Sequence, residues 1–130
     1  MNLLDENFPD DQRSLLRGWR IPFRQIGLDA GHFGVKDDNI IPLLHALRRA
    51  TFFTQDEDFY HRQLCHPAYC LVWLDVSADD AAHCVRRFLR HPRFDSQAKR
   101  VGLVVRAHPE GIHFWQLNRT TLQSAAWPEN

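Results

Sequence analysis

The ten residues from Thr51 to Tyr60 read Thr-Phe-Phe-Thr-Gln-Asp-Glu-Asp-Phe-Tyr and fall into two halves of opposite chemistry. The first half is β-branched and aromatic, which is typical of a buried strand. The second half places three acids directly after that strand. Carboxylates repel one another, so acids gathered at a strand end destabilise the fold unless they hold a cation. Because ligands bind at the carboxyl ends of parallel strands, Asp56 and Asp58 are predicted to form half of a divalent-metal site.

The composition favours one globular domain without a strong overall electric field. The chain has 130 residues, enough for one domain with a core, and its 16 basic and 16 acidic residues cancel. Net neutrality excludes a global attraction to nucleic acid or to membranes. Only Lys36 and Lys99 are lysines, and the other basic residues are arginines. Arginine grips phosphate and carboxylate with two parallel hydrogen bonds, so the bias fits a phosphate-rich substrate or a partner protein.

Cysteine content and hydropathy predict a cytoplasmic protein. The three cysteines, Cys65, Cys70 and Cys84, are odd in number, and the chain shows no secretory signal. Both observations favour reduced thiols in a cytoplasmic protein. No apolar run approaches the roughly 20 residues that a membrane span requires, so no membrane association is expected.

Strand and helix signals alternate along the chain, which predicts a mostly parallel sheet with helices on both faces. The expected architecture is an α/β protein, a three-layer α/β/α sandwich whose last strand returns as an antiparallel hairpin edge. A single domain is assigned to residues 1–118 and a polar C-terminal tail, pinned by Trp127, to residues 119–130. The predicted strands are 1–4, 21–26, 51–54, 69–74, 101–105 and 112–117, and the predicted helices are 8–18, 37–49, 59–64 and 77–90.

This architecture brings acids that are distant in sequence to one edge of the sheet. Asp5, Asp56 and Asp75 each follow a predicted strand, and Asp37 begins the helix between the second and third strands. Strand ends of a parallel sheet share one edge, so these side chains are expected to converge there. Asp75 is interpreted either as a fifth acid of the site or as a surface residue, with the surface interpretation preferred.

Three short motifs give the chain a family resemblance. They are LLDENFP at residues 3–9, GVKDDNI at residues 34–40 and TQDEDF at residues 54–59. Together they closely resemble the signature of small bacterial PIN-like proteins, and the match covers roughly residues 2 to 75. The resemblance implies a PIN-like fold and a Mg²⁺- or Mn²⁺-dependent nuclease, often the toxin of a toxin–antitoxin pair. It also implies RNA as substrate, an antitoxin protein or a second copy in a homodimer as partners, and Asp5, Asp37, Asp56 and Asp58 as metal ligands and catalytic residues.

The chemistry expected of four aspartates agrees with that resemblance. Ligands that are all oxygen suit Mg²⁺ or Mn²⁺ better than zinc. A bound ion lowers the pKa of its water and neutralises charge on the scissile phosphate. Tyr60, next to the acids, is a candidate for stacking on an RNA base, but packing against the sheet edge is its preferred interpretation. The arginines that are candidates for holding the RNA backbone are Arg48, Arg49, Arg62, Arg86, Arg87, Arg90 and Arg93.

Other interpretations of the same residues stay open at the level of sequence. Asp37 and Asp58 also suit helix caps, and the arginines after Ala78 also suit a solvated helix face. A non-catalytic PIN-like binding module would retain the acids without cleaving RNA. A receiver-like phospho-acceptor domain would need a lysine after the fifth strand, where this chain has Arg106 and His108. Arginine is a poor substitute for that lysine, so this third interpretation is the weakest.

Overall fold

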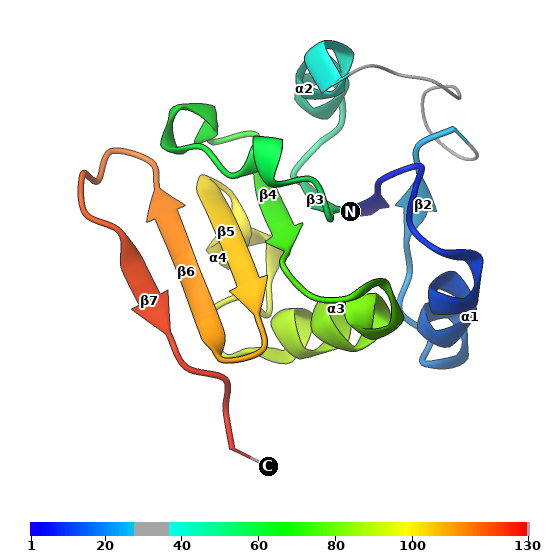
Figure 1. The fold of residues 1–130 in the computed structure, drawn as a ribbon. Coiled ribbons are helices and arrows are strands. Elements are labelled where there is room, and N and C mark those ends of the chain that lie inside the picture. Colours follow the sequence, from blue (N-terminus) through cyan, green and yellow to red (C-terminus); the bar gives the residue numbers. More distant parts are fainter. Residues whose placement is uncertain (28–36, 130) are drawn as a thin grey trace.

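A computed structural model describes residues 1–27 and 37–129, with the main chain alone at residues 37 and 38. Within these residues a single mixed sheet forms, ordered β2-β1-β3-β4-β5-β6-β7 (Figure 1). The first five strands of that order run parallel, and β6 and β7 are antiparallel to their neighbours. The strands are β1 (Asn2–Leu4), β2 (Arg24–Gln25), β3 (Ala50–Thr54), β4 (Tyr69–Leu74), β5 (Leu103–His108), β6 (Gly111–Gln116) and β7 (Gln123–Ala125).

The helices connect the parallel strands, as the alternating pattern predicts. The helices α1 and α3 lie side by side, and α2 lies apart from them (Figure 1). The segment 59–64, expected to be a helix, contains only short 3-10 turns. The segment 77–90, also expected to be a helix, begins with a 3-10 turn and continues as an α-helix. The helical segments are α1 (Asp10–Gly18), α2 (Asp37–Ala46), α3 (Ala81–Arg90), α4 (Gln97–Arg100) and the 3-10 turns η1 (Glu57–Phe59), η2 (Arg62–Leu64) and η3 (Ala78–Asp80).

Apolar clusters cover both faces of the sheet. Neighbouring strand residues alternate between them, because successive side chains of a strand point to opposite faces. Phe53 belongs to the cluster that contains Phe88 of α3, whereas Phe52 belongs to the cluster that contains Leu44 of α2. This burial on both sides explains why β4, Tyr69–Leu74, has almost no polar residue. The expected α/β class with a mostly parallel sheet and an antiparallel C-terminal edge is confirmed.

Segments near the C-terminus also differ from the expectations. The polar tail expected from residue 119 onward contains β7, which pairs with β6 and extends the sheet by one strand. The tail is anchored at Trp127, as expected, because its indole Nε1 donates to the carbonyl oxygen of His108 at 2.7 Å. The short helix α4 was not predicted, since its four residues are too few for a periodic pattern. The loop expected at residues 27–36 lies outside the described residues, apart from Gly27.

The three cysteines are all free thiols in the structure. Burial raises the pKa of the Cys84 thiol to about 12 and raises that of Cys70 above its usual range. Since the thiolate is the reactive form, iodoacetamide at pH 8 is expected to label half-buried Cys65 first and the other two only after unfolding. Mass spectrometry of the labelled native protein measures this order. Equal labelling of all three thiols in the folded protein would contradict the burial of Cys70 and Cys84.

The helices in the described ranges fall short of the length and apolar character needed to cross a bilayer.

Candidate functional site

A cavity of about 270 Å³ opens at the carboxyl ends of β1 and β3. These strands are neighbours in the sheet, but the chain leaves β1 towards β2 and leaves β3 towards β4, in opposite directions. Such a reversal separates the two outgoing loops and forms the crevice in which open α/β sheets bind their ligands. The lining residues come mainly from those two loops: Asp5, Glu6, Asn7, Phe8, Gln55 and Asp56, together with Ile26 and Ile40.

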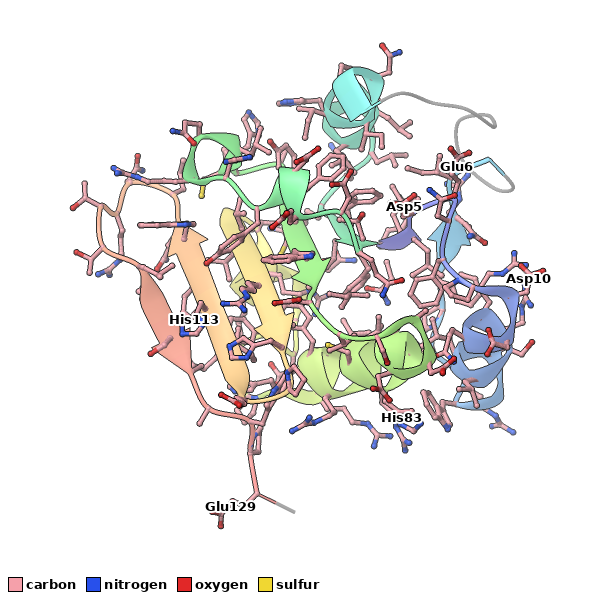
Figure 2. The ribbon with its side chains drawn as sticks, viewed as in Figure 1. Asp5, Glu6, Asp10, His83, His113 and Glu129 are labelled. Atoms are coloured by element: carbon pink, nitrogen blue, oxygen red, sulfur yellow. The ribbon has the colours of Figure 1, made fainter. Side chains whose placement is uncertain are left out.

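Asp5 follows β1 and is fixed by main-chain and side-chain contacts. Its backbone N–H donates to the carbonyl of Phe53 at 3.0 Å, so the β1–β3 pairing continues to the acid itself. Its Oδ1 accepts from the backbone N–H of Asn7 at 3.2 Å, and its Oδ2 accepts from the hydroxyl of Thr54 at 2.7 Å. The carboxylate is therefore held at the cavity wall in one orientation. Figure 2 labels Asp5 and Glu6 at this end of β1.

Thr54, the last residue of β3, connects the two acids of the cavity. The hydroxyl that donates to Asp5 also accepts the backbone N–H of Asp56 at 3.0 Å. Thr54 is only 1% exposed, so this hydroxyl has little access to water and its orientation is set by those two partners. One buried group thus fixes the position of Asp5 relative to the loop that carries Asp56.

Asp56 lines the cavity and also begins the 3-10 turn η1. Its Oδ1 accepts the backbone N–H of Asp58 at 2.9 Å, which is an N-cap bond. Its second carboxylate oxygen is not used in that bond. Asp58 is exposed and is not among the residues that line the cavity, so the structure brings Asp56, but not Asp58, to Asp5.

The remaining acids of the sequence prediction take different positions. The side chain of Asp37 lies outside the described residues, although its main chain begins α2 as predicted. Asp75 follows β4 but binds Arg106 of β5, with Oδ2 accepting from Nε at 2.9 Å and from Nη2 at 2.8 Å. This ion pair supports the surface interpretation of Asp75. The same ion pair engages Arg106, which stands where a receiver-like domain would need a lysine.

A buried glutamine supports the loop that presents Asp5. Gln25 of β2 is 2% exposed, and its side-chain amide donates to the carbonyl oxygens of Asp5, Glu6 and Phe8 at 3.0 to 3.3 Å. Its Oε1 accepts in turn from Nη1 of Arg13 at 2.7 Å. The Gln25 side chain thereby hydrogen-bonds the backbone of the loop between β1 and α1, which gives this loop a defined conformation.

Thr54 and Gln25 were not selected from the sequence as site residues. Thr54 carried a usable signal, because a threonine two positions before Asp56 can bond to the backbone of the acid loop. Gln25 carried none, since its role depends on β2 lying beside β1 in the sheet.

The donor set of the cavity fits a hard divalent cation that keeps part of its water shell. Asp5 and Asp56 supply carboxylate oxygens, and the described residues that line the cavity include no sulfur or imidazole ligand. Mg²⁺ retains several waters and is often bound through one or two carboxylates, so a pair of aspartates meets its requirement. In the part of the chain that the structure describes, no three His, Cys, Asp or Glu side chains lie where they could share one ion.

The candidate RNA-binding side chains are spread over several surfaces. Tyr60 packs against Trp73 with ring centroids 5.5 Å apart, which favours its structural interpretation. Arg62 lies over the Trp115 ring, and Arg48 and Arg49 line a separate hollow beside His45. The candidates that do gather in one place are Arg86, Arg87 and Arg90 of α3.

The fold and the cavity define the class of this protein: an α/β protein with an acidic crevice between two adjacent parallel strands. Comparison with protein-family models, with curated proteins and with solved structures found no match. The resemblance to PIN-like proteins therefore rests on the three sequence motifs alone and stays a prediction.

Proposed function

We propose that the protein is a Mg²⁺- or Mn²⁺-dependent ribonuclease whose metal ligands include Asp5 and Asp56. The observation that carries this proposal is the hydrogen-bond bridge through the Thr54 hydroxyl, which joins the Asp5 carboxylate to the backbone N–H of Asp56 beside one cavity. The cavity also lies at the reversal of strand order, where this type of sheet binds ligands.

The protein groups have separate tasks in such a reaction. A divalent ion, when bound, supplies positive charge next to the phosphate and increases the acidity of water. Asp5 and Asp56 provide the oxygens that hold it, and the Thr54 hydroxyl keeps Asp5 in the required orientation. Gln25 keeps the loop of Asp5 from shifting, through its bonds to the loop carbonyls. Asp37 and Asp58 stay predicted ligands, for which the described cavity provides no direct support.

The finer features of the sequence prediction belong to the same proposal. Apolar clusters on both faces of the sheet support a three-layer α/β/α arrangement of PIN-like type. A role as toxin, with an antitoxin protein as partner, follows from the family resemblance, as do a homodimer and a cytoplasmic location. RNA as the substrate has the same origin.

The second candidate is a non-catalytic binding module, and a specific observation favours it. Both oxygens of Asp5 and one oxygen of Asp56 already accept hydrogen bonds within the protein. A carboxylate oxygen has two lone pairs, so these bonds leave acceptor capacity for a metal. They also give both acids a structural role that does not require one. Calorimetric titration with Mn²⁺ separates the candidates, because the module predicts no heat of binding.

The metal dependence of cleavage tests the proposed function directly. Purified protein is expected to cut a labelled single-stranded RNA with Mg²⁺ or Mn²⁺ and to lose this activity on chelation. Activity should return when the ion is restored. The Asp56→Asn variant is expected to cleave at least about 10-fold more slowly, because one ligand charge is lost. The matched control is Asp79→Asn, which removes an exposed carboxylate of η3 that does not line the cavity. Equal rates with and without metal would overturn the proposal.

A further inference from the structure

The outer surface of α3 carries a basic groove that lies apart from the acidic cavity. A hollow of about 480 Å³ is lined by His83, Arg86, Arg87, Arg90 and Pro128, and we call it the α3 groove. The four basic residues are spaced i, i+3, i+4 and i+7, which places them on one face of the helix. Figure 2 shows His83 on the side of α3 that faces away from the sheet, and Asp5 and Glu6 elsewhere on the molecule.

Two tryptophans hold arginines of the groove in place. The guanidinium carbon of Arg86 lies 4.6 Å from the ring centroid of Trp19, and that of Arg87 lies 4.3 Å from the ring of Trp127. His83 also packs on Trp19, with ring centroids 4.9 Å apart. Cation–π contacts of this kind restrict the arginine rotamers before any ligand binds. Less entropy is then lost on binding, so the groove is preorganised for an anion.

The groove holds positive charge that the described residues leave uncompensated. None of its lining residues is acidic, and Arg86, Arg87 and Arg90 form no ion pair among the described side chains. The Nε of Arg86 is buried and has no hydrogen-bond partner, which is costly for a charged group. Asp80 lines an adjoining hollow together with His83 and Arg87, and its Oδ2 already accepts from the Ser77 hydroxyl.

Helix stability accounts for only part of this arrangement. Arg87 and Arg90 stand in the last turn of α3, where cations favourably oppose the helix dipole. That effect gives no reason for His83 and Arg86 nearer the start of the helix, or for the tryptophans beneath the charges. Like charges at i, i+3 and i+4 repel one another, and an anion bound along the row would relieve that repulsion.

We propose that the α3 groove binds the phosphodiester backbone of single-stranded RNA, an inference that rests on the proposed ribonuclease function. The basic row extends about 10 Å along the helix axis, since seven residues rise 1.5 Å each. A row of that length matches a ligand with repeated negative charges better than it matches a single small anion. Guanidinium groups bind phosphate oxygens in pairs, so neighbouring arginines can contact successive phosphates. The groove thus holds the strand, and the acidic cavity is reserved for cleavage.

Binding without catalysis provides the test. A fluorescently labelled single-stranded RNA is titrated with the full-length protein in the presence of chelator, and anisotropy is read over a range of salt concentrations. The Arg87→Gln/Arg90→Gln variant changes two exposed side chains and is expected to bind at least about 10-fold more weakly. The slope of log affinity against log salt should fall by roughly 1.4, because each phosphate contact on a single strand contributes about 0.7. For Arg90→Gln alone, the slope should fall by about 0.7, half of the change expected for the double variant.

The control variant is Arg24→Gln/Arg119→Gln, which removes the same charge from exposed positions outside the groove. It is expected to change affinity less than about 2-fold, apart from the general effect of net charge. Equal weakening by both double variants would overturn the proposal, and so would wild-type affinity in the groove variant. Displacement of the RNA by poly-glutamate at equal charge concentration would assign the groove to an acidic protein segment instead. If the protein bound RNA without metal but showed no metal-dependent cleavage, the proposed ribonuclease function would be refuted and RNA binding by the α3 groove would be supported.

Discussion

The Asp5→Asn variant is expected to lose about 100-fold or more of the Mg²⁺-dependent cleavage rate while remaining folded. Asparagine keeps the size of the side chain, and its carbonyl oxygen can still accept the Thr54 hydroxyl at the position of Oδ2. The negative charge that would hold a cation is removed. A charge contribution of about 3 kcal/mol corresponds to roughly 100-fold in rate, at 1.36 kcal/mol for each factor of ten. Single-turnover cleavage at saturating Mg²⁺ measures the change.

Two variants of Thr54 separate loss of charge from loss of position. Thr54→Val removes the hydroxyl bridge and leaves both carboxylates, so a smaller loss of about 10-fold is expected, as for groups that orient metal ligands. Thr54→Ser retains the hydroxyl and should restore most of that loss. Higher Mg²⁺ should partly rescue Thr54→Val and should not rescue Asp5→Asn. If folded Asp5→Asn protein cleaved RNA at the wild-type rate, the acidic cavity would have no part in catalysis.

Much of the sheet follows from local sequence signals. The continuous apolar run Tyr69–Leu74 became β4 with the predicted bounds, and the strand before the acids became β3 with one more residue at its start. Their burial on both faces requires helices above and below, which fixes the class of the fold. By contrast, β7 has three residues of mixed polarity, and only its pairing with β6 makes it a strand. A pattern-based prediction has no access to such pairing.

The candidate site was predictable in outline but not in its contacts. The alternation of strands and helices predicts that Asp5 and Asp56 lie at the same edge of the sheet, and the structure adds that their strands, β1 and β3, are neighbours. Asp58 stands two residues from Asp56, yet the turn η1 leaves it exposed and away from the cavity lining. Sequence spacing alone cannot give the direction of a side chain in an irregular turn. Asp75 illustrates a second limit, since its partner Arg106 is distant in the sequence.

Arg100 is the clearest case of an important residue without a sequence signal. It closes the short helix α4, is 6% exposed and ties that helix to the sheet. Its Nε donates to the hydroxyl of Thr51 at 2.9 Å, and its Nη1 donates to the carbonyl of Phe94 at 2.7 Å. Burial lowers the pKa of this guanidinium, yet an arginine keeps its charge in proteins. Its contribution comes from long-range contacts that no local pattern encodes.

The Arg100→Met variant is therefore expected to lower the free energy of unfolding by about 2–4 kcal/mol. Methionine can fill part of the space, but it leaves the Thr51 hydroxyl and the Phe94 carbonyl without their donors. The loss is a large fraction of the 5–15 kcal/mol that is typical of a folded domain. Urea unfolding followed by circular dichroism measures it, with an unchanged slope showing that the native state keeps its compactness.

The matched control for Arg100→Met lies next to it in the chain. Lys99 stands on the same helix and pairs with Asp95 at 2.8 Å, but its side chain is 50% exposed. Exposed ion pairs contribute little, so Lys99→Met is expected to cost less than about 1 kcal/mol. If both variants lowered stability equally, the buried contacts of Arg100 would not be what secures α4 to the sheet. A larger cost at Arg100 would instead show that a buried guanidinium with neutral partners can be an essential tie in this fold.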